Sequence, residues 1–319
     1  NWKGPIFTDS GGFQIFSLAK IRKTTEAGVL FQFDLDGKQE ILSPEKSVDI
    51  QANLGSDIAL ILDDFPGYPF EYERAKESIA LTKRWAERAV KEHKKIVTDG
   101  DPINPGQKLW GIVQGASFPD LREQSAKDMV IFGFEGFAIG GVAVGEPHEE
   151  MMKAVEAAVP HLPEKAPKHL LGVGTPFDII QAVSRGCDSF DCVIPTREAR
   201  HGRLYITAKI QTGSQAEGYT TIDIRLEKYK EDFTPPDNTC DCYLCLNHTK
   251  SYLRHLFATG EPLAIDSYGL TTILPRLRRP HHRHAKSRGR PYLASTADQP
   301  ALDLGKLLSG PSAAHSPTT

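Results

Sequence analysis

The sequence predicts an α/β fold, a (β/α)₈ barrel in which helices surround a parallel sheet. Short apolar runs of strand-forming residues alternate along the chain with longer segments of helical period. Polar residues follow nearly every one of these runs, at the place where the strands of a barrel build its active site. A doubly wound open sheet is the competing architecture, but its ligands gather at a single switch point.

Six strands can be assigned, over residues 5–7, 57–62, 109–113, 136–139, 169–173 and 189–194. A closed barrel needs eight strands. The chain begins with Asn1 rather than Met. Two strand units are therefore expected upstream of Asn1.

Helices are predicted between the strands. The first begins with Ser43 as its N-cap and Pro44 in its first turn, and it ends at Gly55. A long amphipathic helix covers residues 72–95, and another runs from a Thr cap to a Gly stop over residues 175–186. The apolar faces of these helices are expected to pack on the sheet.

Composition favours a globular protein of the cytoplasm. The chain has 319 residues, of which 39% are hydrophobic, so it can bury a substantial core. It lacks an apolar run of about 18 residues and a secretory signal, which argues against a membrane partner. The formal net charge is −3. Any contact with nucleic acid must therefore rest on a local cluster such as residues 195–203, "PTREARHGR".

Three of the five cysteines, Cys240, Cys242 and Cys245, lie within six residues. This spacing is typical of a metal knuckle rather than a disulfide framework. A tetrahedral zinc ion takes four ligands, so a fourth ligand has to be found elsewhere.

The polar residues at the strand ends include two aspartates, Asp9 and Asp191. Asp191 lies in an apolar strand, where an unpaired charge is costly, so it needs a partner or a chemical role. Either aspartate alone could be a turn or capping residue. Together, paired carboxylates in one pocket indicate displacement at an anomeric carbon, that is, glycosyl transfer. Gln114 could read the edge of a planar heterocycle, although a structural hydrogen bond fits it equally well.

Six motifs resemble the tRNA-guanine transglycosylase family, bacterial type, in the order in which that family carries them. They are "TDSGGFQ", "GIVQG", "AIGGVAVGE", "GVGTP", "FDCVIPTREARHG" and "CDCYLC". The resemblance covers residues 1–264. It implies a (β/α)₈ barrel with a zinc-binding subdomain, commonly a homodimer. It also implies exchange of the wobble guanine of GUN-anticodon tRNAs for a 7-deazaguanine base, in the queuosine pathway.

The resemblance also implies roles for individual residues. Asp191 would attack the ribose C1′ and form a covalent tRNA intermediate, and Asp9 would move the proton on the departing and incoming bases. The base would be recognised by Asp63, Gln114, Gly141, the backbone of Val142 and the ring of Phe13. Arg197 and Arg200 would hold the anticodon loop, although a solvated basic turn is the alternative for both.

One departure and one match to the family pattern bear on the incoming base, which is either 7-aminomethyl-7-deazaguanine or queuine. The bacterial pattern resembles "DECTPYP", whereas this chain reads "DDFPGYP", so Phe65 replaces a small thiol beside the base pocket. Val144 matches the bacterial form, which takes the aminomethyl base.

In the family the fourth zinc ligand resembles a His near the position of Thr271, and this chain has none there. His248 and His255 are expected in core or surface roles. The resemblance stops near Ala264, and we expect that a change of reading frame near codon 265 removes the "HN" pair and an amphipathic helix. The chain as written is then expected to bind zinc weakly, through the three cysteines alone.

The expected domains are a catalytic region over residues 1–212, a zinc-binding subdomain over residues 213–264 and a disordered tail over residues 265–319. Two alternatives to an active enzyme remain. One is a truncated or frameshifted product that cannot fold alone. The other is a non-catalytic tRNA-binding accessory chain, against which the presence of Asp9 and Asp191 argues.

Overall fold

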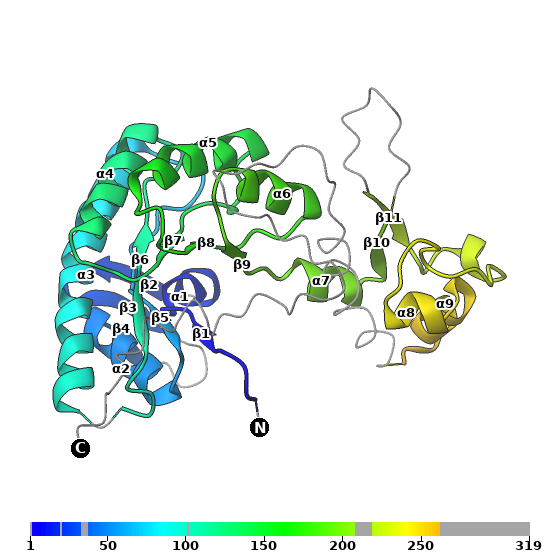
Figure 1. Ribbon diagram of the computed structural model, residues 1–319, viewed down its shortest axis with the longest axis horizontal. Helices are drawn as coiled ribbons and strands as arrows, with labels where there is room; N and C mark the ends of the chain where they lie inside the picture. Colours follow the sequence, from blue (N-terminus) through cyan, green and yellow to red (C-terminus); the bar gives the residue numbers. More distant parts are fainter. Residues whose placement is uncertain (1, 20, 33–37, 101, 208–218, 262–319) are drawn as a thin grey trace, which may run out of the picture.

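The computed structural model describes residues 2–19, 21–32, 38–100, 102–207 and 219–261 (Figure 1). The expected tail and the position of Thr271 lie outside the described residues. The division into three domains stays a prediction.

The predicted parallel sheet is present. Its six strands are hydrogen-bonded in the order β1-β5-β6-β7-β8-β9, and every neighbouring pair is parallel. The strands are β1 (Phe7–Thr8), β5 (Ile58–Leu60), β6 (Lys108–Val113), β7 (Phe137–Ile139), β8 (Lys168–Leu170) and β9 (Ser189–Phe190). All six correspond to predicted strands, so the α/β class is confirmed.

The sheet is curled into part of a barrel. The ring of Phe7 on β1 stacks on the ring of His169 on β8, with centroids 4.7 Å apart, although β5, β6 and β7 lie between these strands in the sheet. Adjacent strands are about 4.8 Å apart, so a flat sheet would hold the two rings much farther from each other. Closure into eight strands remains a prediction.

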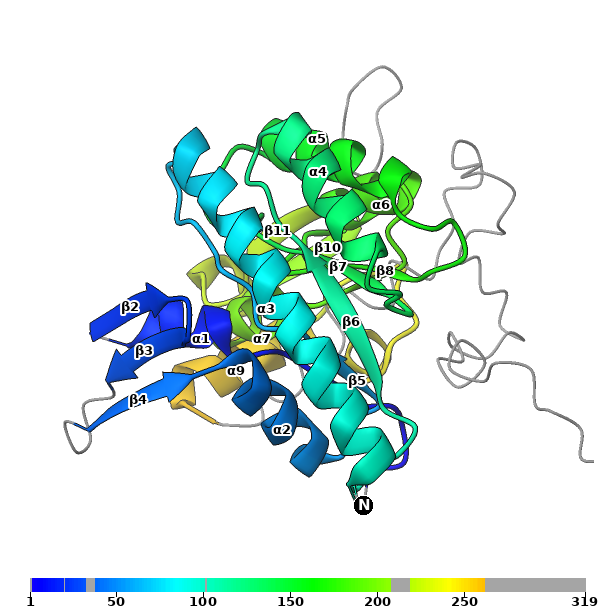
Figure 2. The same ribbon diagram turned by 90° about the vertical axis from the view of Figure 1, so that its left-hand side faces the viewer.

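Helices cover the outer face of the sheet. In Figure 2, α3 and α4 lie in front of β5 and β6, and both helices contact β6. The helices of this layer are α2 (Pro44–Leu54), α3 (Tyr72–Asp99), α4 (Pro119–Val130), α5 (His148–Ala158) and α6 (Pro176–Ser184), and the short 3₁₀ helix η1 (Val159–His161) follows α5. Their apolar faces and the strands form one large core.

The predicted caps of two helices are confirmed by their contacts, whereas the long helix predicted over residues 72–95 continues to Asp99. The hydroxyl of Ser43 accepts from the backbone N–H of Lys46, and Gly55 ends α2 in the left-handed conformation at φ 69°. The hydroxyl of Thr175 caps α6 in the same way, accepting from the N–H of Asp178.

One predicted strand is too long. Residues 189–194 were expected to be extended, but β9 ends at Phe190 and α7 (Ile194–Arg200) begins four residues later. Pro195 lies in the first turn of α7, where its fixed φ suits a helix start. The apolar residues Val193 and Ile194 thus belong to a turn and to the start of a helix, respectively, and not to a strand.

A small antiparallel sheet was not predicted. It consists of β2 (Ile21–Thr25), β3 (Gly28–Gln32) and β4 (Gln39–Leu42), and it follows the short helix α1 (Gly12–Leu18). Arg88 of α3 fastens it by donating to the carbonyl of Glu26 and to the carboxylate of Glu45. This insertion sits between the first two strands of the parallel sheet.

The C-terminal described residues form a separate lobe, at the right of Figure 1. It contains the hairpin β10 (Arg203–Thr207) and β11 (Tyr219–Asp223), the 3₁₀ helix η2 (Glu227–Tyr229), and helices α8 (Tyr243–Asn247) and α9 (Lys250–Thr259). A second, smaller core is shared by its elements and the end of α7, and includes Leu204, Ile224 and Leu253.

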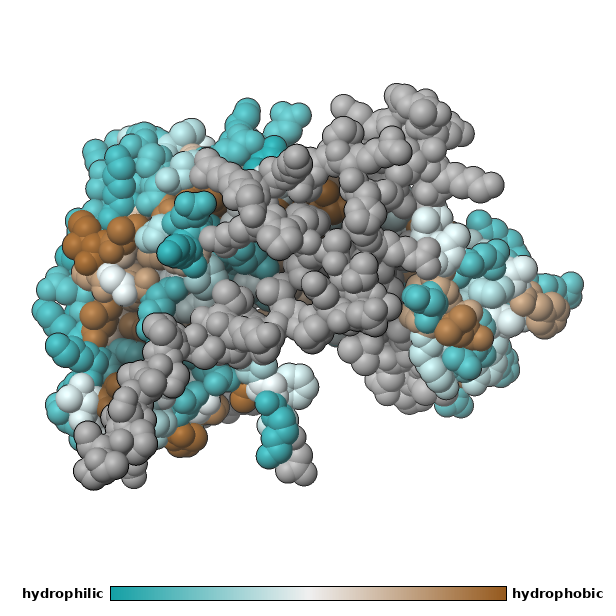
Figure 3. All heavy atoms as spheres, in the orientation of Figure 1, coloured by the Kyte–Doolittle hydropathy of each residue, from teal (hydrophilic) through white to brown (hydrophobic). Residues whose placement is uncertain are grey.

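Hydrophilic residues cover much of the outer helical layer, as Figure 3 shows at its left. Among the described residues, none of the helices has both the length and the apolar character needed to cross a membrane.

Candidate active site

Three predicted site residues meet where the first strands end. Asp63 lies shortly after β5 and Gln114 follows β6, and the amide Nε2 of Gln114 donates a short hydrogen bond to Oδ2 of Asp63. Burial, together with the negative charges of Asp9 and Asp64, raises the pKa of Asp63 to about 7. Asp9 follows β1, the strand that pairs with β5, and lies close enough for its charge to act on Asp63.

The neighbouring Asp64 has a structural role instead. Its carboxylate is buried and accepts from both terminal nitrogens of Arg74 on α3, at 2.6 and 2.7 Å. Only the first aspartate of the pair is thus free to meet a ligand.

Asp9 is exposed and held by local contacts. Its Oδ1 accepts from the N–H of Ser10 at 2.8 Å, and its Oδ2 accepts from Nε2 of Gln14 on α1, also at 2.8 Å. These contacts fix the carboxylate while leaving it open to solvent, which suits a group that exchanges protons with a ligand.

Gln114 is a buried residue with one unused acceptor. Its side chain is 1% exposed, and among the described residues Oε1 has no hydrogen-bond partner. The backbone of Gly141 lies against it, because a Cβ placed on Gly141 would come within 2.2 Å of that oxygen. Gly141 also has φ at 63°, so two independent reasons demand glycine there. A buried acceptor without a partner is costly, and a ligand N–H could satisfy it.

Arg122 on α4 was missed by the sequence reasoning. It is fully buried, and its guanidinium donates to the carbonyls of Ala116, Val113, Gly140 and Gly141 at 2.7 to 3.1 Å. Burial lowers its pKa to about 9. The arginine thereby locks the loops after β6 and β7 against each other. In the sequence it looks like an ordinary charged residue of an amphipathic helix, and nothing local distinguishes it.

The loop after β7 is closed by Glu146, a second residue that was missed. Its carboxylate accepts from the N–H of Ala143 at 2.5 Å and from that of Val144 at 2.9 Å. Ala143 has φ at 59°, a conformation unusual for a residue with a side chain. The side chain of Val142 is buried, so only its backbone is available to a ligand.

An aromatic cluster forms one wall near the pocket. Phe65 packs edge-on against Phe13 and Phe16, with centroids 5.8 and 4.7 Å away. Phe13 remains 49% exposed, so its ring can still receive a planar ligand. Phe65, the residue that departs from the family pattern, therefore touches the ring expected to stack on the base.

Asp191 was expected to lie inside an apolar strand, but it does not. It follows the end of β9 with its side chain 61% exposed, and it has a partner. Its Oδ1 accepts from Nε2 of His169 at 3.0 Å and from the N–H of Gly172 at 3.1 Å. Burial acts to raise the pKa of Asp191, but these hydrogen bonds outweigh it and hold the pKa below its ordinary value. The carboxylate is thus ionised at neutral pH.

The two predicted catalytic aspartates lie at the same end of the sheet. Asp9 comes two residues after Phe7, and Asp191 is hydrogen-bonded to His169. Because Phe7 and His169 stack across the curled sheet, the ends of β1 and β9 face a common space.

Arg197 and Arg200 lie on α7, directly after Asp191 in the chain. Arg200 is exposed, and the side chain of Arg197 is 53% exposed beside Glu198. Glu198 is paired more closely with Arg203, at 3.0 Å. Both predicted arginines therefore present their charge to solvent, on the helix that follows Asp191 in the chain.

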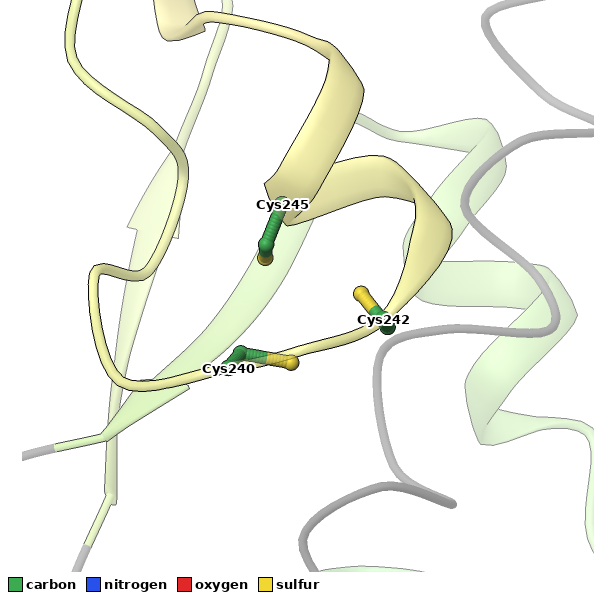
Figure 4. A group of neighbouring side chains, drawn as sticks. All are labelled: Cys240, Cys242 and Cys245. Carbon is green, nitrogen blue, oxygen red and sulfur yellow. The ribbon is translucent and has the colours of Figure 1, made fainter.

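The three cysteines of the C-terminal lobe converge, as Figure 4 shows. The Sγ atoms of Cys240, Cys242 and Cys245 all lie within 4.8 Å of one another. Neither His248 nor His255 belongs to this group; the ring of His248 packs against Tyr243 and Tyr252 instead. Among the described residues, the cluster therefore offers three ligands.

Asp237 anchors the cysteine loop to the hairpin. Its carboxylate accepts from the N–H and hydroxyl of Thr207 at the end of β10, and from the N–H and hydroxyl of Thr239. Burial opposes ionisation, but these four hydrogen bonds lower the pKa of Asp237 to about 2. The loop is thus held in shape by its own contacts.

The donor set fits a thiophilic metal ion. Burial, with the neighbouring thiolates, raises the pKa of Cys245 well above its ordinary value, and burial likewise raises that of Cys240. A dication between the three sulfurs would supply the missing compensation. Three thiolates at this separation match the sulfur ligands of a tetrahedral site.

Comparison with known proteins agrees with this arrangement. The family model described as queuine tRNA-ribosyltransferase matches residues 1–269. The chain is 47% identical over 262 residues to queuine tRNA-ribosyltransferases of Mannheimia succiniciproducens and Haemophilus ducreyi, which covers 82% of this chain and 64% of each relative. It is 46% identical over 284 residues to that of Streptococcus sanguinis, covering 87% of this chain and 70% of the relative. The chain therefore spans about two thirds of the length of these relatives, and it belongs to the queuine tRNA-ribosyltransferase family.

Proposed function

We propose that this chain carries the base-exchange site of a tRNA-guanine transglycosylase. It would exchange the wobble guanine of GUN-anticodon tRNAs for a 7-deazaguanine base, by double displacement through a covalent intermediate on Asp191. The observation that supports this best is the arrangement of an ionised, exposed carboxylate across from a polar pocket that contains Asp63 and Gln114, with Asp9 close to Asp63.

In the first displacement Asp191 attacks the ribose C1′. A bond forms between its free oxygen and C1′ while the bond from C1′ to N9 of guanine breaks, and the bonding electrons leave with the base. Asp9 delivers a proton to the departing guanine. In the second displacement Asp9 removes a proton from the incoming base, whose nitrogen attacks C1′ and releases Asp191.

The pocket suits the hydrogen-bonding edge of guanine. That edge presents the N1–H and the 2-amino group as donors, and the carboxylate of Asp63 and the unused Oε1 of Gln114 are acceptors. The backbone of Gly141 and Val142 lies beside them, and Phe13 would stack on the ring. Guanine and a 7-deazaguanine share this edge, so one pocket can accept both in turn.

The substituent at position 7 of the incoming base distinguishes 7-aminomethyl-7-deazaguanine from queuine. Phe65 packs on Phe13, and Val144 is fixed by Glu146. These bulky side chains favour the smaller aminomethyl base, with queuine as the alternative.

The proposal extends to the partners. Arg197 and Arg200 would contact phosphates of the anticodon loop. Zn²⁺ would be held by Cys240, Cys242 and Cys245, where it would fix the C-terminal lobe. We further propose a homodimer in the cytoplasm, as the resemblance implies.

Incorporation of labelled guanine into tRNA tests this function. Wild-type protein should exchange the base, and Asp191→Asn should lose exchange while tRNA binding is largely kept, because an amide keeps the shape but is a poor nucleophile. Asp99→Asn, at the exposed end of α3, is the matched control and should exchange at the wild-type rate. Exchange by Asp191→Asn near the wild-type rate would refute the assignment. Tight tRNA binding without any exchange by wild-type protein would instead favour an accessory chain.

A further inference from the structure

We infer that His169 is a positioning residue for the nucleophile, which holds one oxygen of Asp191 so that the other faces the ribose. This inference rests on the proposed function, because it concerns the step in which Asp191 attacks C1′. Its basis is the contact between Nε2 of His169 and Oδ1 of Asp191 at 3.0 Å.

The imidazole is fixed in place on three sides. His169 is 5% exposed. Its ring stacks on Phe7 at 4.7 Å, and its Nδ1 lies 2.8 Å from the hydroxyl of Ser189. His169 and Ser189 are register partners in the parallel pairing of β8 with β9. The sheet itself therefore determines where Nε2 points.

Chemistry assigns the donor in each contact. An ionised carboxylate only accepts, so Nε2 must carry the proton that it donates to Asp191. In the neutral ring Nδ1 is then an acceptor, and the Ser189 hydroxyl donates to it. His169 is thus held as the Nε2–H tautomer, with its proton directed at the nucleophile.

The contact matters because an exposed aspartate side chain can otherwise rotate freely. The side chain of Asp191 is 61% exposed, and a free aspartate would sample several rotamers. The His169 Nε2–H and the Gly172 N–H both meet Oδ1, and among the described residues no side chain donates to Oδ2. The attacking oxygen is therefore oriented while no side chain among the described residues competes for it, which keeps it nucleophilic.

Two substitutions separate this role from a packing role. In His169→Gln the amide Nε2 can take the place of the imidazole Nε2 and still donate to Asp191. In His169→Asn the shorter amide can reach Ser189 but not Asp191. His169→Phe keeps the stacked ring and removes both contacts. The single-turnover rate of tRNA adduct formation and the Kd for tRNA are measured for each.

We expect His169→Asn and His169→Phe to form the adduct about 10²-fold more slowly than wild type, with Kd for tRNA unchanged, because misplacement of a reacting group by about 1 Å costs that much. His169→Gln should recover most of the rate. Equal rates in all four proteins, or loss of rate in Gln as well as Asn with normal folding, would overturn the inference.

A second measurement does not depend on activity. Imidazole ¹⁵N shifts of the free protein should show the Nε2–H tautomer at His169. His148 is an internal comparison, because its Nδ1 lies 2.6 Å from the carboxylate of Asp178 and it should show the opposite tautomer. An Nδ1–H tautomer at His169 would overturn the contact. The Nε2–H tautomer in a wild-type protein that forms no adduct would refute the proposed function and the role of His169, but not the contact.

Discussion

The amide of Gln114 donates to the carboxyl of Asp63, in a pocket where burial and the nearby Asp9 raise the pKa of Asp63 to about 7. A carboxyl with this pKa is partly protonated at neutral pH, although two donors on the edge of guanine would bind its ionised form best. The relationship between these residues therefore sets a pH dependence for binding of the base.

We predict that guanine binds more weakly as the pH falls below about 7, because protonated Asp63 loses an acceptor. Binding near neutral pH should also release protons, which calorimetry detects as a binding enthalpy that depends on the ionisation enthalpy of the buffer. Asp63→Asn should bind less tightly and without this proton release. A wild-type affinity that is constant from about pH 5 to about pH 8 would contradict the assigned role of Asp63.

Asp63 should also affect the stability of the protein. Its pKa is higher in the folded than in the unfolded chain, so its ionisation favours unfolding, and wild-type protein loses stability from this group as the pH rises from about 4 to about 7. Asp63→Asn should therefore gain stability relative to wild type progressively across this window. Urea unfolding at several pH values measures the difference, and a constant difference would contradict the prediction.

Arg122 should be essential for the structure of the pocket. Arg122→Met would remove the guanidinium from four carbonyls. The carbonyl of Val113 would keep the N–H of Gly140 as a donor, and each group left unsatisfied costs about 1–3 kcal/mol. We expect a loss of about 3 kcal/mol or more in the free energy of unfolding. Lys127→Met on the same helix removes only an exposed pair with Glu123 and should change stability by less than about 1 kcal/mol. Similar losses in both variants would argue against a special role for Arg122.

Glycine should be required at position 141 for two reasons. One is its backbone conformation, and the other is the close approach of Gln114, which leaves no room for a side chain. Gly141→Ala would place a methyl group 2.2 Å from Oε1 of Gln114 at φ 63°, whereas Gly133→Ala has φ at 72° with open space around it. Both variants carry the backbone strain, so the difference between them reports the clash. We expect guanine binding to fall at least about tenfold in Gly141→Ala only. Unchanged binding in Gly141→Ala would remove this glycine from the base pocket.

The three cysteines should bind one zinc ion weakly, since the described residues supply three thiolates. Cys245→Ser should abolish this binding, whereas Cys187→Ser, at a buried thiol outside the cluster, should not. A chromophoric chelator that competes for zinc measures both. Tight stoichiometric binding with His248 or His255 as a ligand would contradict the expectation.

Much of the fold could be predicted because its signals are local. The caps at Ser43 and Thr175 and the apolar runs of the six parallel strands follow from residues close in sequence. The small sheet β2-β3-β4 was missed because at least half of the residues in two of its three strands are polar and because it is fastened by Arg88, which lies 62 residues beyond Glu26.

The same distinction applies to the site. Asp9, Gln114 and Asp191 could be proposed from the sequence because each follows a recognisable strand and lies in a motif that resembles the family, and Asp63 because it follows a strand. Their partners could not. Arg122 contacts carbonyls of two other segments, and His169 meets Asp191 only because β8 pairs with β9 and the sheet curls. Such contacts depend on tertiary structure, which cannot be predicted from a local sequence pattern.

The central claim is that Asp191 is the nucleophile, and identification of the residue that carries the ribose tests it most directly. Wild-type protein is incubated with a GUN-anticodon tRNA, denatured, and digested with nuclease and protease, and the modified peptide is sequenced by mass spectrometry. We predict a ribose-linked nucleotide on Asp191, in the peptide that contains residues 186–197, and none in Asp191→Asn. A nucleotide attached to Asp9, Asp63 or any other residue would contradict this account.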